Sequence, residues 1–105
     1  MNPEIKKKWI EALESGKYQQ ATGALKVDDG YCCLGVLCDL HRKQMKKKGW
    51  NNGRYLGDCY YLPDAVRNWA GLVKNNLKVC GSQLIALNDN GKSFLEIANF
   101  IRSKL

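Results

Sequence analysis

Three of the five cysteines of this chain lie within seven residues, in the segment GYCCLGVLCDL (residues 30–40). Thiols so close together could hold a metal ion, supply a nucleophile or fill space in a core. A structural zinc site takes four ligands from two separate close pairs, such as two C-x2-C units. The ligands available here would be Cys33, Cys38, His41 and a distant Cys59 or Cys80. They form no pair of pairs, so we expect no metal.

A catalytic cysteine is the second interpretation of this segment. It needs a lowered pKa, which a helix N-terminus or a neighbouring imidazole can provide. Cys32 or Cys33 meets the first condition, because a helix is predicted to begin just after them. His41 lies about two turns further along that helix, too far from Cys33 to accept its proton. Aliphatic neighbours favour the third interpretation, in which the cysteines are buried core residues in a reducing compartment.

Capping residues and hydrophobic spacing predict the elements that position these residues. A first helix is predicted over residues 3–15, with Asn2 as its N-cap. Residues 25–33 predict a β-hairpin with an Asp-Gly turn, and residues 34–48 a second helix. Glycines and aromatic residues over 49–62 predict a second short β element.

The last third of the chain is predicted to be mainly helical. Pro63 begins a short helix that Gly71 ends, and residues 75–79 predict a strand. A short helix follows at residues 84–87, and a capping box at Ser93–Glu96 begins the final helix.

Length and composition place these elements in one domain. The expected fold class is α+β, a single small domain over residues 1–105 with four or five helices and one or two short antiparallel β-hairpins. No apolar run approaches the roughly 20 residues of a membrane span, and no secretory signal is present. We therefore expect a cytoplasmic protein with no membrane partner. No P-loop, G-x-G-x-x-G, H-E-x-x-H or nucleophile-elbow motif occurs, so neither catalytic residues nor a cofactor are predicted.

The charge pattern favours an anionic partner. The formal net charge is +7, and eight of the seventeen cations lie in residues 6–8 and 42–48. An aromatic, glycine-rich segment follows at residues 50–61, and bases stack on such rings. The alternative is that these rings fill the core. The predicted ligand-binding residues are Lys46, Lys47, Lys48, Trp50, Arg54, Tyr55 and Tyr60.

Four motifs together resemble a family of small, uncharacterised proteins carried by tailed bacteriophages and prophages. They are W-x2-AL-x-SG-x-Y-x-Q (9–20), GYCCLGVLC (30–38), LP-x2-V-x2-WAGL (62–72) and LND-x-G-x-SF-x2-IA (87–98). The resemblance covers most of the chain and implies a phage origin, but brings no activity or catalytic residues. One departure is Asn75-Asn76, where the family pattern has Asn-Pro.

By this resemblance the protein would act in the cytoplasm of an infected host cell. The leading hypothesis is a non-enzymatic binding protein that captures an anionic ligand, a nucleotide signal or nucleic acid, and so antagonises a host defence. Such binders commonly share pockets between subunits, so a symmetric homo-oligomer is expected. The alternatives are a protein-binding inhibitor of a host enzyme, a thiol enzyme, and a small DNA-binding protein. Residues 87–98, which resemble half of a helix-turn-helix, favour the last.

Overall fold

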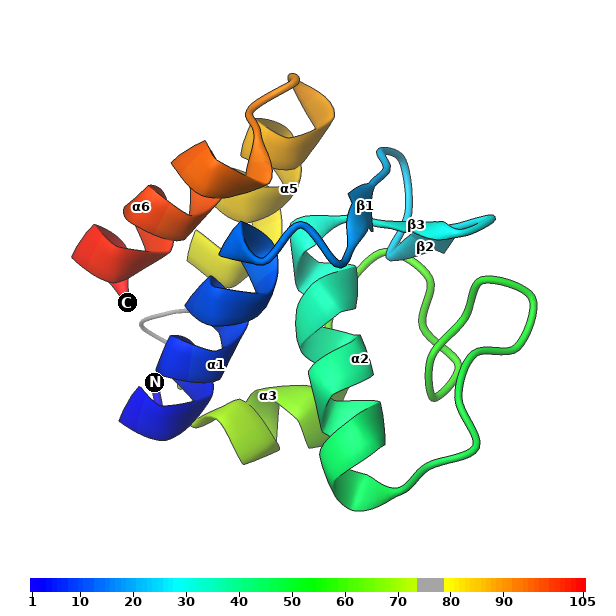
Figure 1. Ribbon diagram of the computed structural model, residues 1–105. Helices are drawn as coiled ribbons and strands as arrows, with labels where there is room; N and C mark the ends of the chain where they lie inside the picture. The colour runs from blue at the N-terminus through cyan, green and yellow to red at the C-terminus, as the bar shows by residue number, and fades with distance from the viewer. Residues whose placement is uncertain (74–78) are drawn as a thin grey trace.

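The computed structural model describes residues 1–73 and 79–105, and these form an α+β fold, as predicted. Three helices are separated by a small sheet and a long loop in the first part of the chain (Figure 1). The elements before residue 74 are α1 (Pro3–Glu14), β1 (Gln19–Gln20), β2 (Lys26–Val27), β3 (Gly30–Tyr31), α2 (Cys33–Met45) and α3 (Asp64–Ala70). Those after residue 78 are a π-helical turn η1 (Val79–Gln83), α5 (Leu84–Asp89) and α6 (Phe94–Lys104).

Three helix boundaries lie where capping residues predict, whereas α2 ends at Met45, three residues before its predicted end at residue 48, because Lys46 takes a left-handed conformation. The side chain of Asn2 accepts a hydrogen bond from the backbone N–H of Glu4 at 2.9 Å. The hydroxyl of Ser93 likewise accepts the N–H of Glu96 at 3.2 Å, which satisfies a free donor at the start of α6. Gly71, at a φ of +71°, ends α3. These three boundaries are set by local side-chain chemistry, and the predictions based on them are confirmed.

The sheet has the order β1-β3-β2, and its antiparallel β2–β3 pair is the predicted hairpin. The turn differs in detail, because Gly30 already pairs with Val27. The turn residues are therefore Asp28 and Asp29, with Asp28 at a φ of +53°. β1 runs parallel to β3, with Gln19 opposite Gly30, a pairing that the sequence did not predict.

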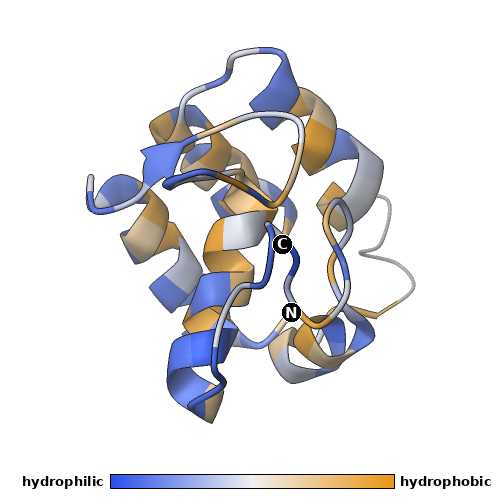
Figure 2. Cartoon of the chain, turned by 90° about the vertical axis from the view of Figure 1, so that its right-hand side faces the viewer, coloured by the Kyte–Doolittle hydropathy of each residue, from blue (hydrophilic) through white to orange (hydrophobic). Residues whose placement is uncertain are grey.

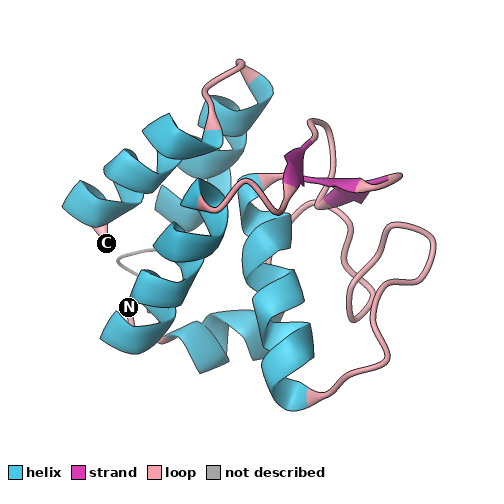
Figure 3. Ribbon diagram, viewed as in Figure 1, coloured by secondary structure: helices cyan, strands magenta, loops and turns pink. Residues whose placement is uncertain are grey.

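The second predicted β element, at residues 49–62, is wrong. The chain between α2 and α3 is loop throughout (Figure 3) and contains only two isolated bridges, Asn51 with Arg54 and Tyr55 with Asp58. Each bridge closes a tight turn, so the chain reverses direction before a strand can extend. The central turn residues all have positive φ: Asn52 (52°), Gly53 (76°), Leu56 (51°) and Gly57 (92°).

The predicted strand at residues 75–79 falls largely outside the described residues, as does Asn75-Asn76. Val79 itself begins η1. No helix in the described part of the chain has both the length and the apolar character needed to span a bilayer.

The core surrounds α2, which lies between α1, α3, α5 and the sheet (Figure 1). Its residues Cys33–Asp39 are all buried. The backbone of Leu25 passes directly over its first turn, where the carbonyl of Leu25 accepts the N–H of Cys32 at 3.0 Å. A Cβ added at Gly35 would overlap that carbonyl oxygen and lie 2.8 Å from the carbonyl carbon. Only glycine permits this approach.

A buried amide fixes α5 to the same end of α2. Asn88 is fully buried, and its Nδ2 donates to the carbonyl of Ala21 at 2.7 Å. Its Oδ1 accepts from the N–H of Cys33 at 3.2 Å and from the side-chain amide of Gln20 at 2.9 Å. Asn88 therefore links β1, α2 and α5 with satisfied polar groups in the interior.

The Gly35 contact gives a prediction about stability. We expect Gly35→Ala to lower the free energy of unfolding by about 3 kcal/mol, because the new methyl group must displace backbone rather than a flexible side chain. Urea denaturation followed by circular dichroism measures this change. Gly81→Ala is the control, since a Cβ at Gly81 meets nothing within 4 Å, and its stability should be unchanged or slightly raised. Equal losses in both variants would contradict the packing argument.

Candidate functional site

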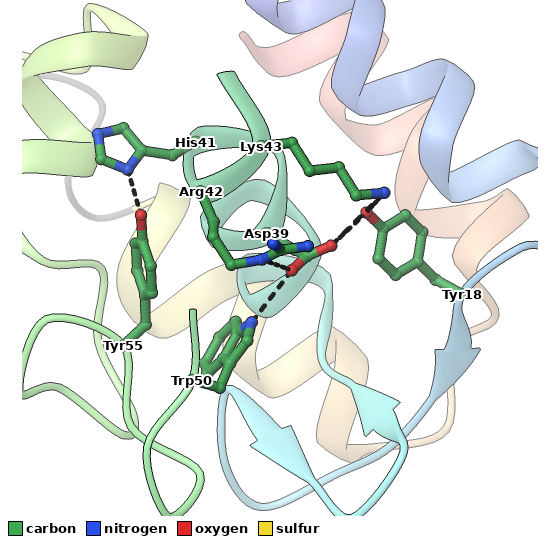
Figure 4. A network of polar contacts seen from close by, with 7 residues as sticks. All are labelled: Tyr18, Asp39, His41, Arg42, Lys43, Trp50 and Tyr55. Carbon is green, nitrogen blue, oxygen red and sulfur yellow. Dashed lines mark hydrogen bonds and ion pairs between the residues drawn. The ribbon is translucent and has the colours of Figure 1, made fainter. Parts of the chain in front are cut away.

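A buried carboxylate, that of Asp39, organises the exposed side of α2 (Figure 4). Asp39 is 2% exposed, and its Oδ1 accepts hydrogen bonds from Nε of Arg42 at 2.7 Å and Nε1 of Trp50 at 3.1 Å. Its Oδ2 accepts from the hydroxyl of Tyr18 at 2.7 Å. Nζ of Lys43 lies 3.7 Å from Oδ2 and 3.1 Å from the Tyr18 hydroxyl. The Asp39 side chain thus joins α2 to Tyr18, in the segment before β1, and to Trp50, in the loop after α2.

The network keeps Asp39 ionised. Burial by itself would raise the pKa of Asp39, but the hydrogen bonds from Arg42, Tyr18 and Trp50 outweigh it and lower the pKa below the usual value. Burial, together with the hydrogen bond to Asp39, raises the pKa of Tyr18, so that Tyr18 remains a protonated donor. The group is therefore a structural ion cluster with its proton positions fixed near neutral pH.

A row of aromatic rings lies beside Asp39. In order they are Tyr18, Tyr31, Trp50 and Tyr55, with successive ring centroids 5.1, 5.7 and 5.3 Å apart. Nζ of Lys43 lies 5.2 Å from the centroid of the Tyr18 ring, and Nζ of Lys26 lies 5.3 Å from that of Tyr31. These contacts are of cation–π type, so the rings hold both ammonium groups at the surface.

The burial of Tyr55 argues against its predicted role in ligand binding. It is fully buried, and its hydroxyl lies 2.6 Å from Nδ1 of His41. His41 is also buried, and its ring packs against Trp69 with centroids 5.1 Å apart. Burial, and secondly the positive charge of Lys47, lower the pKa of His41. A ring enclosed in this way cannot stack on a ligand, so Tyr55 anchors the loop to α2 instead.

Tyr60 is exposed but lies away from the predicted lysines. It lines a small hollow with Cys32, the N-cap of α2, whereas Lys46 is the C-cap of the same helix. Thirteen helical residues separate the two ends by about 20 Å. Trp50 is half-buried and bound to Asp39. The predicted site residues therefore do not form one cluster, because the loop runs back along α2 from its C-terminal to its N-terminal end.

Positive charge is concentrated along the C-terminal half of α2 and the loop that follows it. Residues 40–57 contain no carboxylate and six cations, and we call this range the basic segment. Its cations are Arg42, Lys43, Lys46, Lys47, Lys48 and Arg54. Figure 2, which is seen from the side of the long loop, shows hydrophilic residues in blue at the lower end of α2. Lys46, Lys47 and Lys48 are exposed, and among the described residues none of their side chains has a carboxylate within ion-pair distance. Their charge faces solvent.

Several residues of this region were missing from the predicted site. Asp39 with Arg42 and Lys43 could have been found, because acid and base three and four residues apart share a helix face. Tyr18 and Tyr31 could not, because their contact depends on the parallel β1–β3 pairing.

Cys32, Cys33, Cys38 and Cys80 are buried core residues, whereas Cys59 is partly exposed. Burial raises the pKa of Cys32 to about 11, and it also raises the pKa values of Cys33 and Cys38. A raised pKa disfavours the thiolate that a nucleophilic mechanism requires, so the structure does not support a thiol enzyme at this segment. Within residues 1–73 and 79–105, no group of three or more histidine, cysteine or acidic residues is placed to hold a metal ion.

Comparison with known proteins adds a family. A family model described as "Domain of unknown function (DUF8296)" matches residues 1–105. The chain belongs to this family. No curated protein and no solved structure matches the chain. The family description names no activity, so the functional argument rests on the charges and contacts described above.

The Asp39 cluster gives a prediction with a pH signature. We expect Asp39→Asn to lower the free energy of unfolding by about 2 kcal/mol at neutral pH, because Arg42 and Trp50 lose an ionised acceptor. The folded-state pKa of Asp39 is depressed, so its contribution is present above the unfolded value near 4 and is lost as pH falls through the folded value. Urea denaturation near pH 7 and pH 3 should therefore show the difference shrinking in acid.

The control for this substitution is Asp64→Asn. Asp64 pairs with Arg67 but its side chain is 80% exposed, so its loss should change stability by less than about 0.5 kcal/mol. An Asp39→Asn deficit that is the same at both pH values would contradict the charge argument.

The His41–Tyr55 contact gives a second pH prediction in a different window. The folded-state pKa of His41 is depressed, so stability should be highest above the unfolded value of about 6.5 and fall as pH drops toward the folded value. His41 is the only histidine in the sequence, so a His41→Gln variant should lack this loss. Urea midpoints measured at about pH 7.5 and pH 5.5 compare the two proteins. A wild-type midpoint that does not fall by more than that of the variant would refute the prediction.

Proposed function

We propose that this is a phage-encoded, non-enzymatic binding protein that captures an anionic ligand, and that the ligand is nucleic acid bound through its phosphates. The observation that carries the proposal is the basic segment, with its six cations and no carboxylate over eighteen consecutive residues. Phosphate neutralisation by lysine and arginine is the main source of affinity in such complexes.

The charge of the basic segment that no described carboxylate pairs with lies at Lys46, Lys47, Lys48 and Arg54. Asp39 compensates Arg42 and lies near Lys43, and it is buried, so it does not screen the residues that follow the helix. Lys46, Lys47 and Lys48 carry no such compensation from the described residues. Three adjacent exposed ammonium groups on a projecting helix end fit the repeating charge of a phosphate backbone.

The shape of this surface favours a polymer over a small nucleotide. Small anionic ligands bind in concave sites that enclose most of their surface. The lysines lie instead at the C-cap of α2 and in the two residues that follow it. The hollows of about 510 and 490 Å³ have other linings, which include carboxylates. A nucleic-acid backbone can contact a projecting surface without being enclosed.

The helix-turn-helix alternative receives less support. α5 and α6 do form the predicted helix pair, but α6 buries Phe94, Ile97 and Ile101 against the rest of the core. Arg102 of α6 is paired with Glu14 of α1 at 2.7 Å. The basic segment offers more uncompensated charge, which favours binding by phosphate contact over reading of a base sequence.

The biological setting follows from the family resemblance and is part of the proposal. A phage protein of this kind would act in the cytoplasm of the infected cell, where capture of nucleic acid would withhold it from a host defence. This role requires no catalytic residue, which agrees with the raised pKa values of the α2 thiols.

Neutralising the lysines tests the proposal. The variant Lys46→Gln, Lys47→Gln, Lys48→Gln should bind a fluorescent DNA duplex more than about tenfold more weakly, as measured by anisotropy at moderate salt. The slope of log affinity against log salt should fall in magnitude by about two to three, since three phosphate contacts are lost.

The chain supplies a matched control in Lys6→Gln, Lys7→Gln, Lys8→Gln. This variant removes the same number of charges from α1, where Lys6 and Lys7 line a hollow with Arg102 of α6 and with no residue of the basic segment. Its affinity should stay within about threefold of the wild type. Equal losses of affinity in both variants would show that binding depends only on net charge. Absence of duplex binding by the wild type at low salt would refute the proposal.

A further inference from the structure

A hollow of about 510 Å³ lies between the long loop and the start of α3, and none of the six cations of the basic segment lines it. Leu56, Asp58 and Tyr61 line its loop side, and Pro63, Asp64 and Ala65 line its helix side. Leu56 and Tyr61 are 47% and 66% exposed. The hollow thus joins an apolar rim to carboxylates on a chain whose overall charge is +7.

The backbone at Leu56 indicates that this leucine serves the surface rather than the fold. Leu56 has a φ of +51°, in the left-handed region that bulky residues avoid. The preceding turn has the same shape, and there the equivalent position is Asn52, a residue suited to that conformation. Because its side chain is half exposed, Leu56 gains little burial in return for the strain. Strain of this kind is typical of binding sites.

The charge at the hollow is negative and only partly compensated. Arg67 pairs with Asp64, but among the described residues the side chain of Asp58 has no cationic partner. The complementary group would be an apolar side chain flanked by cations.

The chain presents such a group itself. Met45, the last residue of α2, is 45% exposed, and Lys46 follows it at the helix C-cap. We propose that the hollow receives the Met45–Lys46 end of α2 from a second copy of this chain. Met45 would contact Leu56 and Tyr61, and Lys46 would pair with Asp58. This interaction goes beyond nucleic-acid binding and needs no nucleic acid.

Net repulsion between two chains of charge +7 opposes this contact, but the repulsion acts over a longer range than the attraction between Lys46 and Asp58. At physiological salt the Debye length is about 8 Å, so repulsion between distant charges is screened while a pair in contact is not. Hollow and helix end are different patches, so two copies can exchange them reciprocally about a two-fold axis, and both contacts then add.

Analytical ultracentrifugation of the full chain without nucleic acid tests this. The wild type should associate with rising concentration at physiological salt. Leu56→Asn should weaken association about tenfold or more while keeping or raising the melting temperature, because asparagine suits the left-handed turn position. Leu95→Asn is the matched control, since Leu95 is a similarly exposed leucine on α6 and should leave association unchanged.

A charge exchange identifies the pairing. Asp58→Lys and Lys46→Asp should each weaken association, and the double variant should restore it. A wild type that stays monomeric, equal effects of Leu56→Asn and Leu95→Asn, or a double variant without rescue would each overturn the inference. At protein concentrations where the wild type is monomeric, Leu56→Asn should leave duplex affinity unchanged, so this result and the nucleic-acid result can fail separately.

Discussion

The first turn of α2 packs directly on the backbone of Leu25, and this contact fixes where the helix that carries Asp39 and Lys46 begins. Gly35 permits the approach, the Leu25 carbonyl accepts the N–H of Cys32, and Asn88 accepts the N–H of Cys33. The N-terminal end of α2 is therefore fixed by the backbone of Leu25 and by the buried side-chain amide of Asn88. With one end held inside the domain, a helix of thirteen residues must project its other end toward solvent.

Asp39 marks the change along α2 from core to surface. The helical residues before Asp39, Cys33–Cys38, are buried and have thiol or aliphatic side chains, or none, which need no polar partners. Asp39 itself is buried with three hydrogen-bond donors, and one of them, Trp50, directs the long loop back along the helix. The loop is held again where Tyr55 meets His41. One carboxylate thus compensates the nearest cations and leaves those beyond the helix end exposed.

The sequence predicted the features that depend on neighbours in the chain. The caps at Asn2 and Ser93, the β2–β3 hairpin and the burial of the clustered cysteines each follow from a few adjacent residues. The segment 49–62 failed because glycines between aromatic residues are equally typical of short strands and of consecutive tight turns, and the positive φ of Leu56 leaves no sequence signal. The predicted site grouped Tyr60 with Lys46 for the same reason, since the path of the loop decides which end of α2 each one meets.

The two proposed surfaces meet at the C-terminal end of α2, and this links them thermodynamically. Lys46 contacts phosphate in one proposed complex and pairs with Asp58 of a second copy in the other, and one ammonium group cannot fully serve both. By reciprocity, nucleic acid that binds the free helix end must weaken self-association by the factor by which self-association weakens nucleic-acid binding. Lys47 and Lys48 stay available to phosphate in either state, so the coupling is expected to be partial. In the self-associated form, the Lys46 side chains would be unavailable to phosphate until nucleic acid binding dissociates the contact.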